Sequence, residues 1–290
     1  MIEFIIHEKA GKGRASKARA LIEARLDMLN IPYSFHQTVK KGHATFIAEQ
    51  LCQHGATTIV AVGGDGTVHE VLNGLSNFES VRFGIIPTGT GNDFATALDI
   101  PEDPIKALDI IVADYTEHID FYECGNVRGL NIVGTGIDVD ILRHYGSKRM
   151  NNKAQYFFSL VHCLIHYKPY HLTIVESDGK KSKKDAFIAC VCNGKQFGGG
   201  IKICPTASPI DGLLDVIIVN DIPKAQIPAA FIKLISGKIR IVKQTEYLRV
   251  KKITLEGNYN LQIDGEIYEN HKFDVKVIPR TLRMFIPRKI

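Results

Sequence analysis

The sequence predicts an α/β protein in which a three-layer domain with a parallel β-sheet precedes a β-sandwich domain. Up to about residue 120, strand-like and helix-like segments alternate, which places a parallel sheet between two layers of helices. After residue 120 short strands predominate and turn dipeptides separate them, which favours an antiparallel sandwich. The 290 residues suffice for two domains. We therefore expect domains at 1–120 and 121–280, with a tail at about 281–290 that returns to the first domain.

The first domain begins with an apolar strand, and helices and strands then alternate along it. Its expected strands are β-branched or apolar runs at 2–6, 33–38, 57–62 and 83–86. Its expected helices have apolar residues at helical spacing, at 15–29, 44–54, 68–75, 94–98 and 105–112. Gly55 suits the left-handed position after the second helix. Asp103 is the expected N-cap of the last helix, because Pro104 suits the first helical position.

The second domain is richer in strands than in helices. Its expected strands are 171–176, 186–192, 213–219, 248–255, 260–263 and 273–278. Two helices, 156–167 and 226–235, interrupt them. The segment 282–286 is a further strand candidate, which we expect to join the first domain.

Composition and cysteine usage limit the class of protein. Hydrophobic residues make up 45% of the chain and charged residues 23%, as in ordinary globular proteins. No apolar run approaches the roughly 18 residues of a membrane span, and the N-terminus has no signal peptide. Six cysteines form no CxxC pair, so we expect reduced thiols and a cytoplasmic location.

Charge is distributed unevenly between the two parts of the chain. Residues 1–120 contain 10 basic and 16 acidic side chains, whereas residues 121–290 contain 26 basic and 15 acidic ones. An anionic partner of the second part would explain this excess, although charge counting alone favours a solvated basic face. We expect no nucleic-acid partner, because no basic helical stripe, aromatic ribonucleoprotein motif or zinc-finger spacing occurs.

Three glycine-rich loops follow strands of the first domain: Gly11–Gly13, Gly63–Thr67 and Gly89–Asp93. In a parallel sheet such loops converge beyond the carboxyl ends of the strands, where backbone N–H groups bind phosphate. Lys12 adds a positive charge, but carboxylates within the loops would repel phosphate unless a divalent cation or a hydroxyl donor intervenes. The alternative is that the loops are only tight turns. A Walker A loop is absent, and Ser16 replaces the third glycine of a dinucleotide fingerprint.

Two of these loops carry the resemblance to a known family. GGDGTVHEVLNGL (63–75) and GIIPTGTGNDFATAL (84–98) resemble the diacylglycerol kinase catalytic domain of soluble lipid kinases, a family that includes sphingosine kinases. The resemblance implies a Rossmann-like ATP-binding domain, a β-rich lipid-binding domain and an active site between them. It also implies ATP as the phosphoryl donor and Mg²⁺ as the metal.

The resemblance assigns nucleotide contacts to residues in or near the loops. These residues are Gly11, Lys12, Thr38, Gly63, Gly64, Asp65, Gly66, Thr67, Glu70, Thr90, Asn92 and Asp93. Within this set we expect Asp65 to be catalytic and Glu70 to orient its loop, whereas His69 is expected on the helix surface. The first loop departs from the family, which has Asn-Pro where this chain has His7 and Glu8.

Two turns of the second domain also resemble family motifs. Asp211-Gly212 resembles a magnesium-holding turn, in which the Asp211 carboxylate acts with the main-chain carbonyls of Ser208 and Leu213. Asp264-Gly265-Glu266 resembles the family's DGE motif, whose glutamate is the general base, and this implies that role for Glu266. By spacing alone both are ordinary Asp-Gly turns.

We conclude from the sequence that the protein is an ATP- and Mg²⁺-dependent lipid kinase that converts diacylglycerol to phosphatidic acid. The alternatives are an NAD kinase, which shares GGDGT but lacks GTGNDFA, and a nucleotide-binding regulator without catalysis. A dinucleotide oxidoreductase has poor support because the third glycine is missing.

A lipid kinase without a membrane span must associate peripherally with a membrane surface, and we expect contact with anionic lipids. The candidate contacts are the lysines of 180–184 and the pair Lys251-Lys252. A homodimer is also an expectation.

Overall fold

The computed structural model describes residues 1–8, 10–146, 153–176, 179–257, 259–269 and 272–288. The chain divides into two compact units, of which the first is Met1–Asp120 with Arg280–Ile290 and the second is Phe121–Pro279. The chain passes between them twice, in strands β5 (Thr116–Cys124) and β15 (Lys272–Phe285). At this crossing the Arg280 backbone N–H donates to an Asp120 carboxylate oxygen at 2.7 Å.

The first unit is built on a parallel sheet. Its strands are β1 (Ile2–Ile6), β2 (Tyr33–Gln37), β3 (Thr58–Gly63) and β4 (Arg82–Pro87), in the order β4-β3-β1-β2. The end of β15 lies parallel to β4, with Arg283 opposite Arg82. β3 is buried along its whole length, as expected for a strand covered on both faces.

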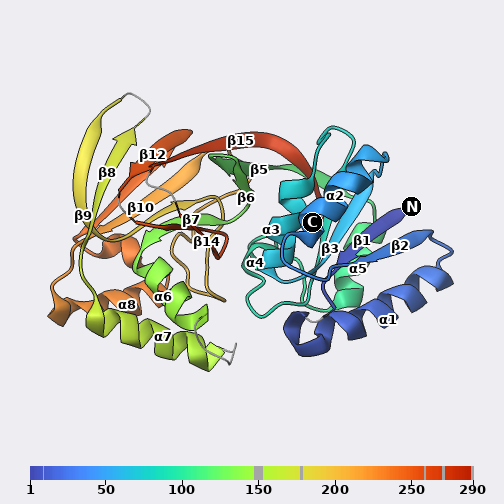
Figure 1. The fold of residues 1–290 in the computed structure, drawn as a ribbon, viewed down its shortest axis with the longest axis horizontal. Helices are drawn as coiled ribbons and strands as arrows, with labels where there is room; N and C mark the ends of the chain where they lie inside the picture. Colours follow the sequence, from blue (N-terminus) through green and yellow to red (C-terminus); the bar gives the residue numbers. More distant parts are fainter. Residues whose placement is uncertain (9, 147–152, 177–178, 258, 270–271, 289–290) are drawn as a thin grey trace. The chain divides into compact units, whose positions relative to one another are not determined.

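Helices cover both faces of this sheet. They are the 3-10 turn η1 (Ala10–Gly13), α1 (Arg14–Met28), α2 (His43–Gln53), α3 (Asp65–Gly74), α4 (Asp93–Ala97) and α5 (Pro104–Val112). Figure 1 shows α1 and α5 on one side of the sheet and α2 and α3 on the other. The predicted cap of α5 is present, because an Asp103 oxygen accepts the N–H groups of Ile105 and Lys106 at 2.9 and 3.0 Å.

The second unit is dominated by antiparallel strands. Beside β5 and β15 these are β6 (Val127–Gly129), β7 (Ile132–Gly136), β8 (Tyr170–Glu176), β9 (Lys181–Cys192), β10 (Leu214–Asn220), β11 (Thr245–Val250), β12 (Lys252–Glu256), β13 (Leu261–Ile263) and β14 (Glu266–Tyr268). The long strand β9 pairs with β7, β8 and β10. The predicted fold class, a three-layer α/β domain followed by a β-sandwich, is confirmed.

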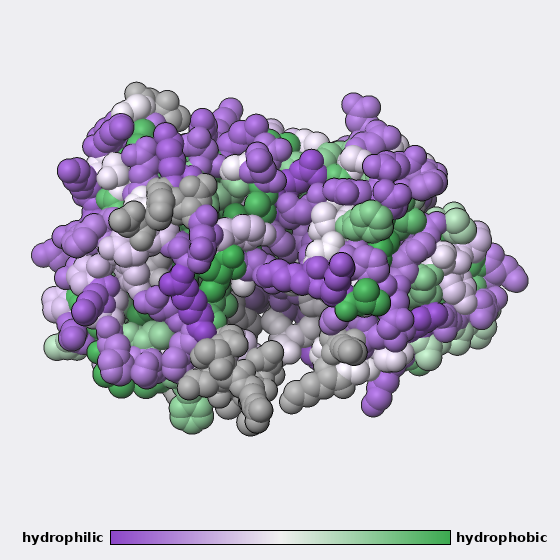
Figure 2. Space-filling view, in the orientation of Figure 1, coloured by the Kyte–Doolittle hydropathy of each residue, from purple (hydrophilic) through white to green (hydrophobic). Residues whose placement is uncertain are grey.

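Three helices cover one side of these strands: α6 (Ile137–Gly146), α7 (Lys153–His166) and α8 (Ile227–Ile235). Figure 2 shows mostly hydrophilic side chains on the visible surface, with hydrophobic ones along the lower edge of the second unit, over α7.

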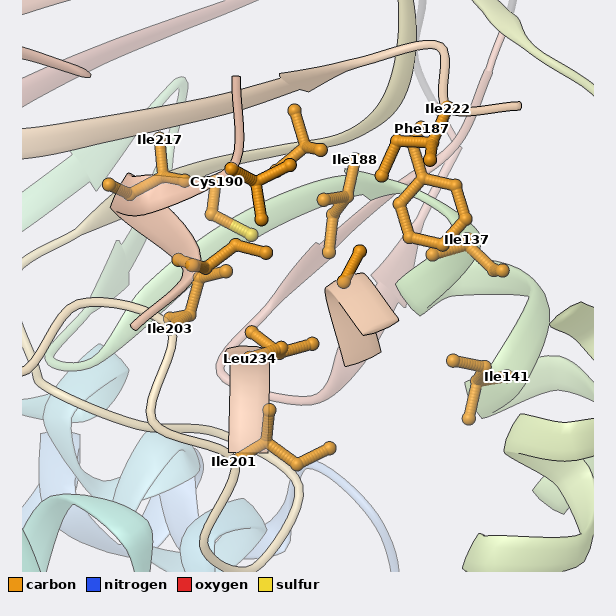
Figure 3. Close-up of a cluster of buried hydrophobic side chains, with 14 of the residues drawn as sticks. Ile137, Ile141, Phe187, Ile188, Cys190, Ile201, Ile203, Ile217, Ile222 and Leu234 are labelled. Carbon is orange, nitrogen blue, oxygen red and sulfur yellow. The ribbon is translucent and has the colours of Figure 1, made fainter. Parts of the chain in front are cut away.

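Alternation along the strands divides the second unit's interior into two cores. Ile188 and Cys190 of β9 belong to the core beneath the helices, whereas Ala189 and Val191 belong to the core between the strands. Figure 3 shows the first of these cores, where Leu234 of α8 lies among side chains from β9 and β10.

The prediction of a single strand at 248–255 is wrong. The structure has two strands there, because β11 pairs with β10 whereas β12 pairs with β8 and β15. Strand β5 was not predicted, since Glu117, Asp120 and Glu123 interrupt its apolar pattern.

Candidate functional site

The three glycine loops of the first unit lie against one another. A Cβ atom on Gly89 would lie 2.3 Å from the Gly64 Cα, and one on Gly11 would lie 2.0 Å from the Thr88 carbonyl oxygen. Gly11 also has a positive φ of 59°. These loops therefore approach backbone to backbone, which leaves room for glycine alone.

The Asp65 carboxylate joins the second loop to the third. One oxygen accepts the Asn92 N–H and the other accepts the Asp93 N–H, both at 2.8 Å. Asn92 closes the third loop on itself, because its amide exchanges hydrogen bonds with the Gly89 N–H and carbonyl at 2.9 and 3.0 Å. Both Asn92 and Asp93 are buried, so the turn before α4 is held from two sides.

The structure adds Arg14, which the sequence analysis did not single out. Its guanidinium donates to the Gly89 carbonyl, and its Nε donates to the Gly11 carbonyl at 3.3 Å. The exposed Arg14 thus places a positive charge where the first and third loops meet. Its position directly after a glycine loop, at the start of a helix, was the available signal. Lys12 lies in η1, and its side chain is outside the described residues.

The threonines differ in what surrounds their hydroxyl groups. The Thr38 hydroxyl and His7 Nδ1 are 2.9 Å apart and share a hydrogen bond, so the unusual His7 holds Thr38 at the end of β2. The Thr67 hydroxyl lies over Gly63, where a Cβ atom would be 2.3 Å from it. Thr90 is exposed at the tip of the third loop.

Two neighbouring residues of α3 make contacts with other parts of the first unit. The Glu70 carboxylate accepts the N–H groups of Gly42 and Ala44 at 2.9 and 3.1 Å. It therefore caps α2, and neither bond involves the three glycine-rich loops. The expectation that His69 lies on the helix surface is wrong, since only 4% of it is exposed. Its face of α3 packs inward because Val68 and Leu72 are buried beside it.

In the second unit, Asp264 anchors the turn that carries Glu266. Its carboxylate accepts the Tyr122 hydroxyl at 2.7 Å and the N–H groups of Leu130, Asn131 and Ile132 at 2.7–2.9 Å. Burial and the adjacent carboxylate raise the pKa of Tyr122 well above its ordinary value, so its hydroxyl remains a donor. Glu266 follows as the half-buried first residue of β14.

The expected magnesium turn holds a positive charge of the chain itself. One Asp211 oxygen accepts the Leu213 N–H at 3.1 Å, and the other pairs with the Arg249 guanidinium. Carboxylate and carbonyl oxygens, including that of Ser208, suit Mg²⁺ in kind. Within the described ranges, however, no three His, Cys, Asp or Glu side chains are arranged to hold a metal ion. Mg²⁺ at Asp211 would therefore compete with Arg249.

Two family models match consecutive parts of the chain. The family model of the diacylglycerol kinase catalytic domain matches residues 2–124, and that of the YegS C-terminal NAD kinase beta sandwich-like domain matches residues 131–286. The chain belongs to the diacylglycerol kinase family of lipid kinases. It is therefore a phosphotransferase, and membership of a kinase family implies ATP as the phosphoryl donor.

Relatives of this lipid kinase family cover almost the whole chain. Diacylglycerol kinase of Bacillus subtilis is 29% identical over 294 residues, which span 95% of each chain. A Xanthomonas euvesicatoria protein named "Probable lipid kinase YegS-like" is 30% identical over 86% of this chain and 85% of its own length. A crystal structure of a Bacillus anthracis diacylglycerol kinase shares the fold, with a TM-score of 0.80, 24% identity and coverage of 99% and 96%.

Membership of this lipid kinase family decides between the alternatives drawn from the sequence. It favours a lipid kinase over an NAD kinase, a regulator without catalysis and an oxidoreductase. Among the described helices, none is both long enough and apolar enough to span a membrane.

Proposed function

We propose that the protein transfers the γ-phosphoryl group of ATP to the free hydroxyl of diacylglycerol, with Mg²⁺, and forms phosphatidic acid. The observation that carries this proposal is an apolar cavity in the second unit. It lies beneath α6, α7 and α8, and all the described residues that line it are apolar except Asp138. Binding sites for small molecules are lined mainly by apolar side chains, and this lining suits acyl chains.

The glycine loops of the first unit supply the complementary polar site. Asp65 and the close backbone approach hold the second and third loops together, and glycine-rich loops of this kind bind phosphate oxygens through backbone N–H groups. Arg14 adds a positive charge beside Gly89. Phosphoryl transfer depends on positioning and on charge neutralisation, and these loops offer both.

The proposed chemical step uses Glu266 as the base. Glu266 takes the proton of the lipid hydroxyl, the hydroxyl oxygen bonds to the γ-phosphorus, and the bond to the ADP oxygen breaks. Asp264 positions Glu266 through the turn that it anchors. When bound at Asp211 or with the nucleotide, Mg²⁺ would neutralise negative charge.

A panel assay tests the proposal. The intact protein is incubated with labelled ATP, with and without Mg²⁺, and with diacylglycerol, sphingosine, ceramide, undecaprenol or NAD. We expect labelled phosphatidic acid, and only when Mg²⁺ is present. Product from NAD alone would overturn the assignment, and product from another lipid would replace diacylglycerol as the substrate.

A diacylglycerol substrate resides in a bilayer, so the proposed reaction takes place at a membrane surface. The excess of basic side chains after residue 120 supports an anionic surface, and a cytoplasmic membrane face supplies one. We therefore propose peripheral association, weakened by salt because ions screen surface charges.

A further inference from the structure

The outward faces of α7 and α8 carry unusually many apolar side chains. On α7 these are Phe158, Val161 and Ile165, at positions i, i+3 and i+7, with Phe158 66% and Ile165 65% exposed. On α8 they are Ile232 and Ile235, and Ile232 is 63% exposed. A single exposed apolar side chain is common on protein surfaces, but a stripe on each of two helices marks an interaction site.

The inner faces of the same helices are also apolar. Leu160 and Leu164 of α7 line the cavity together with Ala230 and Leu234 of α8. Each helix is therefore apolar on two opposite sides, whereas a surface helix in water usually has one apolar side. This pattern indicates that the outer side of each helix also contacts an apolar environment in the functional state of the protein.

Basic side chains predominate in the segments that contain these helices. Each of the stretches 141–170 and 222–245 contains five lysine or arginine residues and no aspartate or glutamate. Within the described part of the chain, Lys168, Lys224, Lys238 and Lys243 are exposed, and no carboxylate forms an ion pair with them. An anionic partner would therefore find these charges available.

Two of the lysines of 180–184, which the sequence indicated as membrane contacts, lie near carboxylates and away from exposed apolar side chains. Lys184 bonds to Glu246 at 2.7 Å, and Lys180 lies 4.0 Å from Glu176. The exposed large apolar side chains of the described chain include none at 171–209. That hairpin offers charge without an apolar surface to insert.

We propose that α7 and α8 dock the protein on an anionic lipid bilayer. We define the docking face as Phe158, Val161, Ile165, Ile232 and Ile235 together with Lys168, Lys224, Lys238 and Lys243. Its apolar side chains enter the boundary between headgroups and acyl chains, and its lysines meet anionic headgroups. The inference rests on the proposed function in that the bilayer supplies the lipid for the cavity behind these helices.

The excess of basic side chains favours a bilayer over a second copy of the chain. A two-fold dimer through this face would bring the same basic surface together with itself, and like charges repel. An anionic bilayer neutralises that surface instead.

The first experiment tests the apolar part of the docking face. The full chain is sedimented with vesicles of phosphatidylcholine, with or without phosphatidylglycerol. For the double variant Phe158→Gln, Ile232→Gln we expect vesicle partitioning to fall at least about tenfold. The matched control is Phe46→Gln on α2, where the phenylalanine is 55% exposed and the variant should bind like the wild type. Equal partitioning of all three proteins would overturn the docking face.

The second experiment separates location from total charge. Lys224→Glu with Lys238→Glu changes the net charge by the same amount as Lys181→Glu with Lys183→Glu on the exposed part of β9. We expect only the first pair to reduce binding to anionic vesicles, by at least about tenfold. Equal losses would show attraction by net charge alone. A wild-type dimer that the first pair dissociates would make the face a self-association surface, and both results overturn the proposal.

A third measurement distinguishes failure of docking from failure of the proposed function. Phosphorylation of a short-chain diacylglycerol, dissolved below its micelle concentration, needs no bilayer, so both docking variants should retain it. If the wild type phosphorylates this substrate but no docking variant loses vesicle binding, the docking face is wrong and the function stands. If the wild type phosphorylates no lipid while the vesicle results hold, the docking face stands and the function is wrong.

Discussion

Asp65 and Asp264 show how one side-chain type organises a site in each unit. Each carboxylate accepts backbone N–H groups from a loop distant in sequence: Asp65 from Asn92 and Asp93, and Asp264 from residues 130–132. A charged acceptor strengthens such bonds. In both units, therefore, a carboxylate holds a loop where the proposed chemistry needs it.

For Asp65→Ala we expect turnover to fall by several orders of magnitude in a folded protein, because the third loop loses its connection to the second. Steady-state kinetics and circular dichroism measure the two effects. The matched control is Asp103→Ala, which also removes two backbone hydrogen bonds, but at the start of α5. It should cost about 0.5–2 kcal/mol of stability and leave turnover unchanged. Equal turnover of both variants would remove Asp65 from the site.

Glu266→Gln keeps the shape of the side chain but removes its basicity. We expect kcat to fall roughly 10²–10⁴-fold while ATP affinity changes little. Asp264→Ala should instead lower the free energy of unfolding by about 1–3 kcal/mol or more, because buried N–H groups lose their acceptor. Kinetics, ATP titration and urea unfolding separate the two roles. A Glu266→Gln enzyme with full kcat would refute the assignment of the base.

The raised pKa of the buried Asp138 makes the stability of the protein depend on pH. Burial raises its pKa from 3.8 to about 7, so the folded state favours the protonated form. The free energy of unfolding should therefore fall as pH rises from about 4 to about 7, by at most about 4 kcal/mol, and level off above that. Asp138→Asn should lose this slope and exceed the wild type in stability at pH 8. Urea unfolding at pH 5 and pH 8 measures both, and identical slopes would contradict the prediction.

At the scale of elements, α2 depends on a neighbouring helix for its cap. Its N-cap residue is Gly42, with a φ of 79°, and no side chain of that residue can accept the first N–H groups. Glu70 of α3 accepts them instead, and a carboxylate at a helix N-terminus is favourable. This contact couples α2 to the helix that follows the GGDGT loop.

We expect Glu70→Ala to lower the free energy of unfolding by about 0.5–2 kcal/mol while kcat stays near the wild-type value. Thermal or urea unfolding and a standard kinase assay are sufficient measurements. If kcat fell as far as in Asp65→Ala with stability intact, Glu70 would orient the nucleotide loop as first expected.

At the scale of the whole molecule, the last strand completes the first unit. The end of β15 lies beside β4, and Leu282, Met284 and Phe285 are at most 1% exposed there. The hydrophobic core of the first 120 residues is therefore complete only when the end of β15 packs beside β4.

Phe285→Ala tests this dependence. We expect a loss of about 3–5 kcal/mol in the free energy of unfolding, because the side chain is fully buried. Met284→Leu, which conserves volume in the same strand, should cost less than about 1.5 kcal/mol. Urea unfolding compares the two, and similar small losses would show that β15 contributes little to the first unit.

The sequence by itself determined the alternation of strands and helices in the first part, the strand-rich second part and the loops that identify the family. These features are local: apolar periodicity, a capping residue such as Asp103 and the run GGDGT are legible within a few residues. The cap at Asp103 was predicted correctly for this reason, since its two donors lie two and three residues away.

Only the tertiary structure decided which distant partner each polar side chain meets. Glu70 bonds to residues 42 and 44, Arg14 to residue 89 and Asp264 to residues 130–132. The split of 248–255 into two strands likewise depends on which strands lie alongside. The physical reason is that hydrogen bonds and burial form between segments that folding brings together, and sequence spacing carries no record of that proximity.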